Sequence, residues 1–165
     1  MNYLQLNSFK KGNDFIKFQE GKFEVVFSTA ENNKSFNRNT EEGIKELEAL
    51  IDKFHGENVE YLKQIHSNKV YTYRKGSNDF KDNEGDALIT NEKKVIIGVF
   101  TADCVPVILV DKENEAIAAI HSGWKGTFSS IVTETILRMK EEYNSKAENI
   151  VAYILDSAVM KYQKI

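Results

Sequence analysis

The chain has 165 residues, of which 41% are hydrophobic and 28% are charged, and its formal net charge is −3. This length predicts one domain, residues 1–165, with a single sizeable core. The net negative charge, with no basic stretch interleaved with aromatic residues, argues against binding to nucleic acid. The longest apolar run, residues 95–110, is interrupted by polar residues and is shorter than the ~20 residues of a membrane helix. We therefore expect neither a nucleic-acid nor a membrane partner.

The location of the protein is indicated by its first residues and its cysteine content. The N-terminal residues lack the basic and apolar regions of a signal peptide. Cys104 is the single cysteine, so it cannot form a disulfide within the chain, which fits a reducing compartment. We expect a cytoplasmic protein.

The first third of the chain predicts a hairpin followed by an amphipathic helix. Runs of aromatic and β-branched residues at 15–18 and 23–27 flank a glycine-containing turn, which is typical of an antiparallel hairpin. Asn39 or Thr40 is predicted to cap a helix with apolar residues every three or four positions. This helix is predicted to end near residue 55.

The centre of the chain predicts strands. Two further hairpins are expected, 60–65 with 69–73 and 86–90 with 95–100. Two nearly apolar strands follow, 105–110 and 116–120, and we expect both to be buried on two faces.

Thr127 is predicted to cap a second helix that runs to about Tyr143. The fold class is therefore expected to be α+β, a layered α/β sandwich with an extensive mixed sheet and at least two packed helices.

Reactive side chains lie next to the two apolar strands. Cys104 precedes the first, and His121 follows the second. Each residue alone has a simpler explanation, as an inert buried cysteine or a hydrogen-bonded structural histidine, and His66 alone could be a turn residue. Together, two histidines and one cysteine are suitable ligands for a catalytic zinc ion with an open fourth position. Their spacing matches no zinc finger, so the site requires the fold to bring them together.

Two carboxylates are further candidates. Asp103 lies beside Cys104 and could act as an acid, a base or a partner of a ligand. Asp86 follows Gly85, and a loop cap is the simpler explanation for it.

The segment after His121 has the composition of an anion site. Gly123, Gly126 and Thr127 lie just before the predicted helix, where free backbone N–H groups favour an anion. Lys125 adds a positive charge and Trp124 a flat apolar face, so the segment could hold a phosphate next to a heterocyclic base. The alternative is a tight turn that only needs glycine, with the tryptophan in the core. The spacing is not that of a Walker motif, so a nucleoside triphosphatase is not indicated.

Four segments in a fixed order resemble the YfiH-like family, whose members are variously called laccase-domain proteins, polyphenol oxidases and purine nucleoside phosphorylases. The segments read QIHSNKV, GDALIT, TADCVP and HSGWKGT, and the resemblance runs from about Phe23 to Ile154. The family fold is an α/β sandwich with layered sheets. The family's ligand histidines fall on His66 and His121, and its ligand cysteine falls on Cys104. The resemblance thus implies zinc at these positions.

The activity implied by the resemblance is phosphorolysis of a purine nucleoside, in which adenosine and phosphate give adenine and ribose 1-phosphate. Adenosine deamination and cleavage of methylthioadenosine are also attributed to the family. The family's usual arginine is Lys125 here, which keeps the charge but not the two-pronged geometry. After Ile154 the chain no longer matches the family pattern, so we expect it to lack the C-terminal part of the family fold.

Three alternatives remain open. The first is a copper polyphenol oxidase. The three histidines of the chain cannot build a four-copper cluster, but copper could still bind at the three-ligand site. The second is a metal-free hydrolase in which His121 activates Cys104 as a nucleophile. The third is an inactive remnant of the family.

Overall fold

The computed structural model describes residues 9–12, 14–29, 32, 34–77 and 80–155. The strands are β1 (Phe9–Lys11), β2 (Phe15–Glu20), β3 (Phe23–Ser28), β4 (Asn58–Glu60), β5 (Val70–Thr72), β6 (Ala87–Thr90), β7 (Val95–Ile97), β8 (Val105–Asp111), β9 (Ala116–Ser122) and β10 (Ile150–Ile154). The helices are α1 (Glu41–Lys53), α2 (Trp124–Phe128), α3 (Ile131–Tyr143) and the 3₁₀ turn η3 (Ala147–Asn149).

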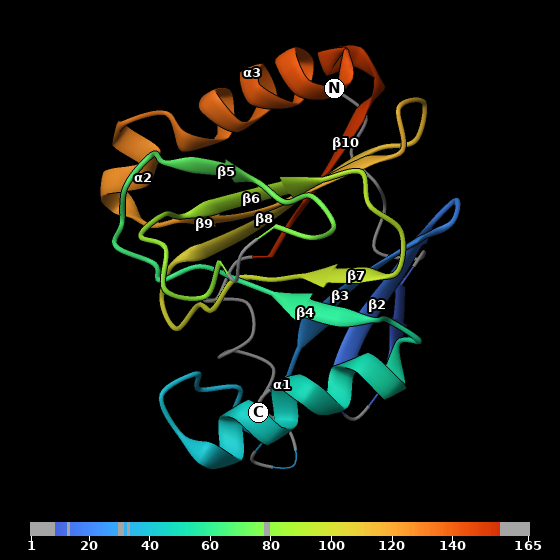
Figure 1. Cartoon of the computed structure of the whole chain (residues 1–165), viewed down its shortest axis with the longest axis vertical. Helices are drawn as coiled ribbons and strands as arrows, with labels where there is room; N and C mark the ends of the chain where they lie inside the picture. Colours follow the sequence, from blue (N-terminus) through green and yellow to red (C-terminus); the bar gives the residue numbers. More distant parts are fainter. Residues whose placement is uncertain (1–8, 13, 30–31, 33, 78–79, 156–165) are drawn as a thin grey trace.

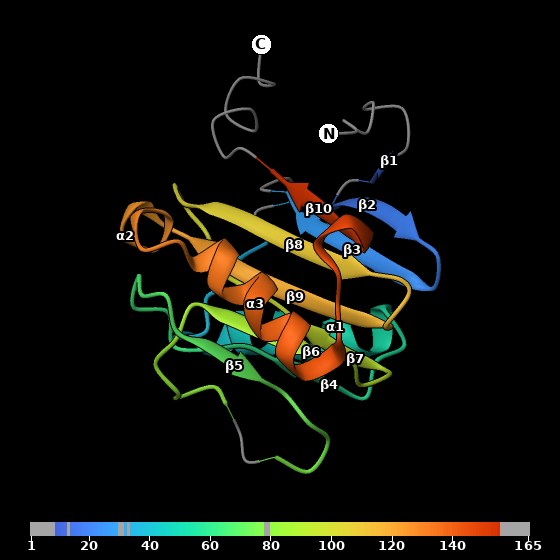
Figure 2. The same cartoon turned by 90° about the horizontal axis from the view of Figure 1, so that it is seen from above.

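These elements form the layered α+β fold that the sequence predicts. The largest sheet has the order β10-β8-β9-β6-β5, and smaller sheets contain β1-β2-β3 and β4-β7. Helix α3 covers one face of the five-stranded sheet, as Figure 2 shows from above. The small sheets lie on the other side, and α1 lies at the opposite end of the molecule from α3 (Figure 1). The prediction of a mixed sheet with packed helices is confirmed.

The N-terminal hairpin and the first helix form as predicted. Strands β2 and β3 pair antiparallel, and β1 adds to the free edge of β2. Helix α1 begins after Thr40, whose hydroxyl oxygen accepts a hydrogen bond from the backbone N–H of Gly43 at 3.1 Å. This bond satisfies one of the N–H groups that a helix start leaves without a partner. The apolar side of α1 buries Leu47 against Val59 and Tyr61.

The two apolar strands β8 and β9 pair antiparallel at the centre of the large sheet. Val107 and Leu109 belong to the core under α3, whereas Val110 packs into a second core with Phe27 of β3. Successive side chains of a strand point to opposite faces, so both faces of β8 are covered. The predicted burial on two faces is confirmed.

The prediction of two central hairpins is wrong. Strand β4 pairs in parallel with β7, and β5 pairs in parallel with β6. Consequently β6 and β7, which the sequence predicts as partners, belong to different sheets. The alternation of apolar residues identifies a strand but carries no information about its partner. Parallel pairing also needs a long crossover in place of a tight turn, which a local pattern does not reveal.

The second predicted helix is divided in two. Ser130 adopts a left-handed backbone conformation, with φ at 61°, between α2 and α3. Thr127 therefore does not cap the long helix but lies inside α2, where its backbone N–H donates to the carbonyl of Gly123 at 2.8 Å. The break also removes Phe128 from the buried face of α3, and its side chain is 89% exposed.

Helices α1 and α3 have 13 residues each. A helix needs about 20 predominantly apolar residues to cross a bilayer. Within the described ranges, no helix combines the length and apolar character that a membrane crossing requires.

Tyr153 of β10 links the five-stranded sheet to the three-stranded sheet. Its ring is buried and lies 5.2 Å from the ring of Phe18, measured between centroids. Its hydroxyl donates a hydrogen bond to the carboxylate of Glu20, which also forms an ion pair with Lys112 at 2.6 Å. The contact between the two sheets thus has an apolar centre and a charged hydrogen bond at its margin.

The substitution Tyr153→Phe should lower the free energy of unfolding by about 1–2 kcal/mol, because it removes a hydrogen bond to a charged group and keeps the ring packing. Urea denaturation at neutral pH measures the difference. In a Glu20→Gln background the same substitution should have a smaller effect, because the acceptor is no longer charged. Equal effects in the two backgrounds would show that the hydroxyl does not act through Glu20.

The pH dependence of this contact has a defined sign. The ion pair with Lys112 and the hydrogen bond from Tyr153 lower the pKa of Glu20 below its ordinary value. The stabilisation is therefore present above the pKa of an unfolded glutamate and is lost as pH falls through the lower pKa of the folded state. The penalty of Tyr153→Phe should shrink over the same acidic range.

Candidate metal centre

The structure brings together His66, Cys104 and His121, which come from three separate segments. The three ligand atoms all lie within 4.8 Å of one another. The Nε2 atom of His66 is 3.7 Å from the Sγ atom of Cys104, and the two imidazole rings are 4.8 Å apart between centroids. In a tetrahedral zinc site, bond lengths of about 2.1 Å to nitrogen and 2.3 Å to sulfur place those atoms roughly 3.6 Å apart. The separation between His66 and Cys104 fits such a site.

The pairing of β9 with both of its neighbours brings these residues together. The register of β8 and β9 places Pro106 opposite His121, so Cys104 lies at the same edge of the sheet. On the other side of β9, Ala87 of β6 is opposite Ile120. The backbone N–H of His121 then donates to the carbonyl of Asp86 at 2.7 Å.

Burial of the three residues is graded. His121 is buried, Cys104 is partly exposed and His66 is exposed. The cluster therefore has a closed side at the sheet and an accessible side at the loop that carries His66. A metal ion held here would have an accessible side for a water molecule or substrate, as catalytic zinc sites require.

The side chain of Asp86 is fully buried and contacts both histidine segments. Its Oδ1 accepts hydrogen bonds from Nδ1 of His121 at 2.8 Å and from the backbone N–H of His66 at 2.9 Å. Its Oδ2 accepts from the backbone N–H and the hydroxyl of Ser67, at 2.6 and 2.7 Å. Burial acts to raise the pKa of Asp86, but these hydrogen bonds outweigh it and hold the pKa well below the usual range. Asp86 is thus both a loop cap and a partner of His121.

Gln64 joins two distant segments of the site, and the sequence alone does not predict this role. Its Nε2 donates to the carbonyl of Phe100, and its Oε1 accepts from the backbone N–H of Phe100, both at 2.7 Å. One side chain thus imitates a strand partner and fastens the segment leading to Cys104 beside the loop of His66. Its place two residues before His66 is the only signal in the sequence.

Gly123 packs so closely against two of the clustered residues that there is no space for a side chain. A Cβ atom at this position would lie 2.5 Å from Cδ2 of His66 and 3.2 Å from Sγ of Cys104. The sequence alone predicts a turn or an anion site at Gly123, because His66 and Cys104, which leave no space for a side chain there, are distant in the chain.

Only part of the predicted phosphate segment has groups that are free to contact a ligand. Trp124 is 75% exposed, so the alternative in which it belongs to the core is wrong. Lys125 is also exposed, and its Nζ lies 5.6 Å from the centroid of the Trp124 ring. In contrast, the hydroxyl of Thr127 donates to the carbonyl of Gly123 at 2.9 Å, and Gly126 is buried. Two accessible side chains thus directly follow Gly123 at the cluster.

Asp103 is exposed and directly precedes Cys104 in the chain. Its expected role as an acid, a base or a partner of a ligand therefore stays a prediction.

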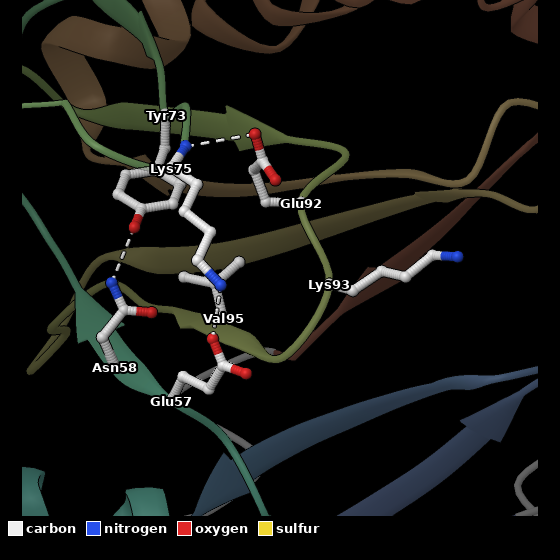
Figure 3. A pocket seen from close by; sticks show the side chains of 7 residues that line it. All are labelled: Glu57, Asn58, Tyr73, Lys75, Glu92, Lys93 and Val95. Carbon is white, nitrogen blue, oxygen red and sulfur yellow. Dashed lines mark hydrogen bonds and ion pairs between the residues drawn. The ribbon is translucent and has the colours of Figure 1, made fainter.

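A separate cavity of about 220 Å³ lies between β4 and the loop after β5, and Figure 3 shows the side chains around it. Four of the residues around it form two pairs, since Lys75 contacts Glu57 at 2.7 Å and Asn58 donates to the hydroxyl of Tyr73 at 2.7 Å. His66, Cys104 and His121 do not line it. It is distinct from the cluster of those three residues.

Comparison with known proteins gives relatives over most of the chain. The family model described as multi-copper polyphenol oxidoreductase laccase matches residues 17–160. A purine nucleoside phosphorylase of Clostridium acetobutylicum is 50% identical over 140 residues, which are 85% of this chain and 58% of that protein. A purine nucleoside phosphorylase of Aquifex aeolicus is 43% identical over 107 residues, 64% of this chain and 48% of that protein. The chain therefore matches only about half of the length of these curated relatives.

Solved structures share the fold. The hypothetical protein YfiH of Bacillus licheniformis superposes with a TM-score of 0.75 at 20% identity, over 90% of this chain and 64% of that chain. A Neisseria meningitidis protein superposes with a TM-score of 0.67 at 24% identity, over 86% of this chain and 62% of that chain. Because the family model matches most of the sequence, the three clustered residues included, the chain belongs to the multi-copper polyphenol oxidoreductase laccase family.

Proposed function

We propose that this chain carries the metal site of a zinc-dependent purine nucleoside phosphorylase, which converts adenosine and phosphate to adenine and ribose 1-phosphate. The observation that carries the proposal is the cluster of His66, Cys104 and His121, whose donor types and separations suit zinc. Relatives at 50% and 43% identity that are named purine nucleoside phosphorylases support the reaction class. Deamination of adenosine and cleavage of methylthioadenosine belong to the same proposal, as does a cytoplasmic location.

Copper is the alternative metal, and the family description names it. Copper binds most nitrogen and sulfur sites more tightly than zinc, so affinity alone does not decide between them. A multi-copper oxidase needs further imidazole ligands, but the third histidine of this chain, His55, follows the end of α1 and is not in the cluster. The donor set of this chain therefore suits one ion better than a group of copper ions.

The chain's own residues supply the other parts of the proposed site. In phosphorolysis the bond between C1′ of the ribose and the purine nitrogen breaks, a phosphate oxygen bonds to C1′, and the purine takes up a proton. Lys125 would attract the phosphate, and the exposed face of Trp124 would stack on the base. Asp103, beside Cys104, is our candidate for the group that protonates the purine.

Bound zinc would act as a Lewis acid on a substrate oxygen or activate a water molecule. The ligands would be Nε2 of His66, Sγ of Cys104 and Nε2 of His121, because Nδ1 of His121 is occupied by Asp86. This assignment takes one donor atom from each of the three residues.

Protein purified without chelators should contain about one zinc ion per chain, measured by elemental analysis. His121→Ala should lose nearly all of it and keep its far-UV circular dichroism, since one ligand of three is removed. His55→Ala is the matched control and should retain full zinc. Zinc-free wild-type protein at neutral pH, or full zinc in His121→Ala, would contradict the assignment.

The same measurement separates the alternatives. Active zinc-free protein that is inactivated by thiol alkylation would identify Cys104 as a nucleophile. The imidazole of His66 lies 3.7 Å from its Sγ, so His66 is a candidate activating base in addition to His121, which the sequence predicts. Zinc binding without nucleoside cleavage would identify this chain as an inactive member of the family.

Gly123→Ala should weaken zinc binding by roughly 10–100-fold, because the new methyl group displaces the ring of His66. Competition with a fluorescent chelator measures the affinity. Gly98→Ala is the control, since a Cβ there meets no atom within 4 Å. Equal affinities in the two variants would show that His66 is not a ligand in its present position.

Lys125→Glu should raise the KM for phosphate by about tenfold or more and leave the zinc content unchanged, because Lys125 contributes charge but no ligand. Lys125→Arg should bind phosphate at least as well as the wild type, since a guanidinium can engage two oxygens. The product should be ribose 1-phosphate, and free ribose would instead indicate a hydrolase. An unchanged KM in Lys125→Glu would remove this residue from the phosphate site.

A further inference from the structure

One buried carboxylate touches both histidine segments of the cluster. Oδ1 of Asp86 accepts from the ring of His121 and from the backbone of His66, and Oδ2 accepts from Ser67. We propose that Asp86 is a positioning residue that holds both histidines in the geometry needed to bind a metal ion. This inference rests on the proposed metal site and names the group that organises it.

The first effect of Asp86 is on the backbone of the loop that carries His66. Three consecutive N–H groups, those of Ile65, His66 and Ser67, point to the carboxylate at 3.3, 2.9 and 2.6 Å. His66 itself has a φ of 60°, a left-handed conformation that is uncommon outside glycine. Successive N–H groups that converge on an anion form a concave nest, which requires such a turn. The carboxylate therefore stabilises the conformation that directs the His66 ring to Cys104.

The second effect is on the proton of His121. Its Nδ1 lies 2.8 Å from Oδ1 of Asp86, and a carboxylate oxygen can only accept a hydrogen bond. The ring proton must therefore be on Nδ1, which leaves the lone pair of Nε2 directed away from Asp86. A histidine ligand needs this lone pair, and partners of this kind commonly set the tautomer at metal sites.

An amide at this position cannot replace the carboxylate. If the NH₂ group of Asp86→Asn takes the place of Oδ2, it faces the N–H groups of Ile65 and Ser67. If it takes the place of Oδ1, it faces the N–H of His66, and His121 can bond to it only by moving its proton to Nε2. The first orientation disturbs the loop of His66 and the second disturbs both histidines, although the side chain has nearly the same shape.

The test compares metal-binding affinity and histidine tautomer in Asp86→Asn and the wild type. Zinc affinity, measured by chelator competition, should fall by about 10–100-fold. In metal-free protein, ¹⁵N NMR of the imidazole nitrogens should show His121 protonated on Nδ1 in the wild type and a changed or mixed state in the variant. A role confined to stability would leave both the tautomer and the zinc affinity of the folded variant unaltered, whereas lower zinc affinity with the proton still on Nδ1 would indicate the first amide orientation, which disturbs only the loop of His66.

Asp111→Asn is the matched control. Asp111 is also fully buried and accepts backbone N–H bonds at a turn, from Glu113 at 3.0 Å and Asn114 at 3.2 Å, but it lies at the opposite end of β8 from Cys104. It should lose stability and keep its zinc affinity. Equal zinc affinity in Asp86→Asn and the wild type would overturn the positioning role, whereas a wild type that binds no zinc would overturn the metal site itself.

A second readout applies if Asp86→Asn fails to fold. Ser67→Ala keeps the carboxylate and removes one of its donors, the hydroxyl at 2.7 Å, so it should fold and weaken zinc binding by a few-fold. Protonation of His121 on Nε2 in the wild-type protein, or unchanged zinc affinity in Ser67→Ala, would contradict the proposal.

Discussion

The pairing of β9 with β8 and β6 is the constraint on which the rest of the structure depends. Side chains alternate between the two faces of a strand, so a shift of register by one residue would turn His121 to the other face. The observed register places His121 opposite Pro106 and joins its backbone N–H to the carbonyl of Asp86. Side chains of the same three strands pack in the main core under α3. A change of this register would therefore also disrupt the central packing.

The strength of this arrangement comes from the mutual compensation of buried polar groups. Asp86 and His121 are both buried. An unpaired charge or ring nitrogen in the protein interior would strongly oppose folding. Each satisfies the other, and the remaining acceptor positions of the carboxylate are filled by the loop of His66. The most exposed of the three clustered residues is thus connected to the most buried one through a single side chain.

Much of this organisation was predictable, because some signals are local. The apolar runs of β8 and β9 and the cap at Thr40 each determine an element from neighbouring residues. The candidate set of His66, Cys104 and His121 followed from donor chemistry and from the family resemblance. The left-handed residue at Ser130 was not predictable, because serine in a helical pattern carries no clear sign of a break.

The rest depends on contacts between distant segments. Strand β4 pairs with β7 and β5 pairs with β6, and the apolar pattern of a strand does not identify its partner. Gly123 looked like a turn residue, because its real constraint comes from side chains far away in the sequence. Gln64 likewise acts on Phe100, a relation that no spacing rule in a single sequence expresses.

The exposure of Trp124 has a practical consequence. The chain contains one tryptophan, and its indole is 75% exposed immediately after the glycine that packs against His66 and Cys104. All tryptophan fluorescence of this chain therefore originates at the residue next to Gly123. An indole in water emits at longer wavelengths than one that is shielded, so any molecule that covers this side chain should shift the emission to the blue. The chain thus contains its own optical probe for any molecule that covers Trp124, without an attached dye.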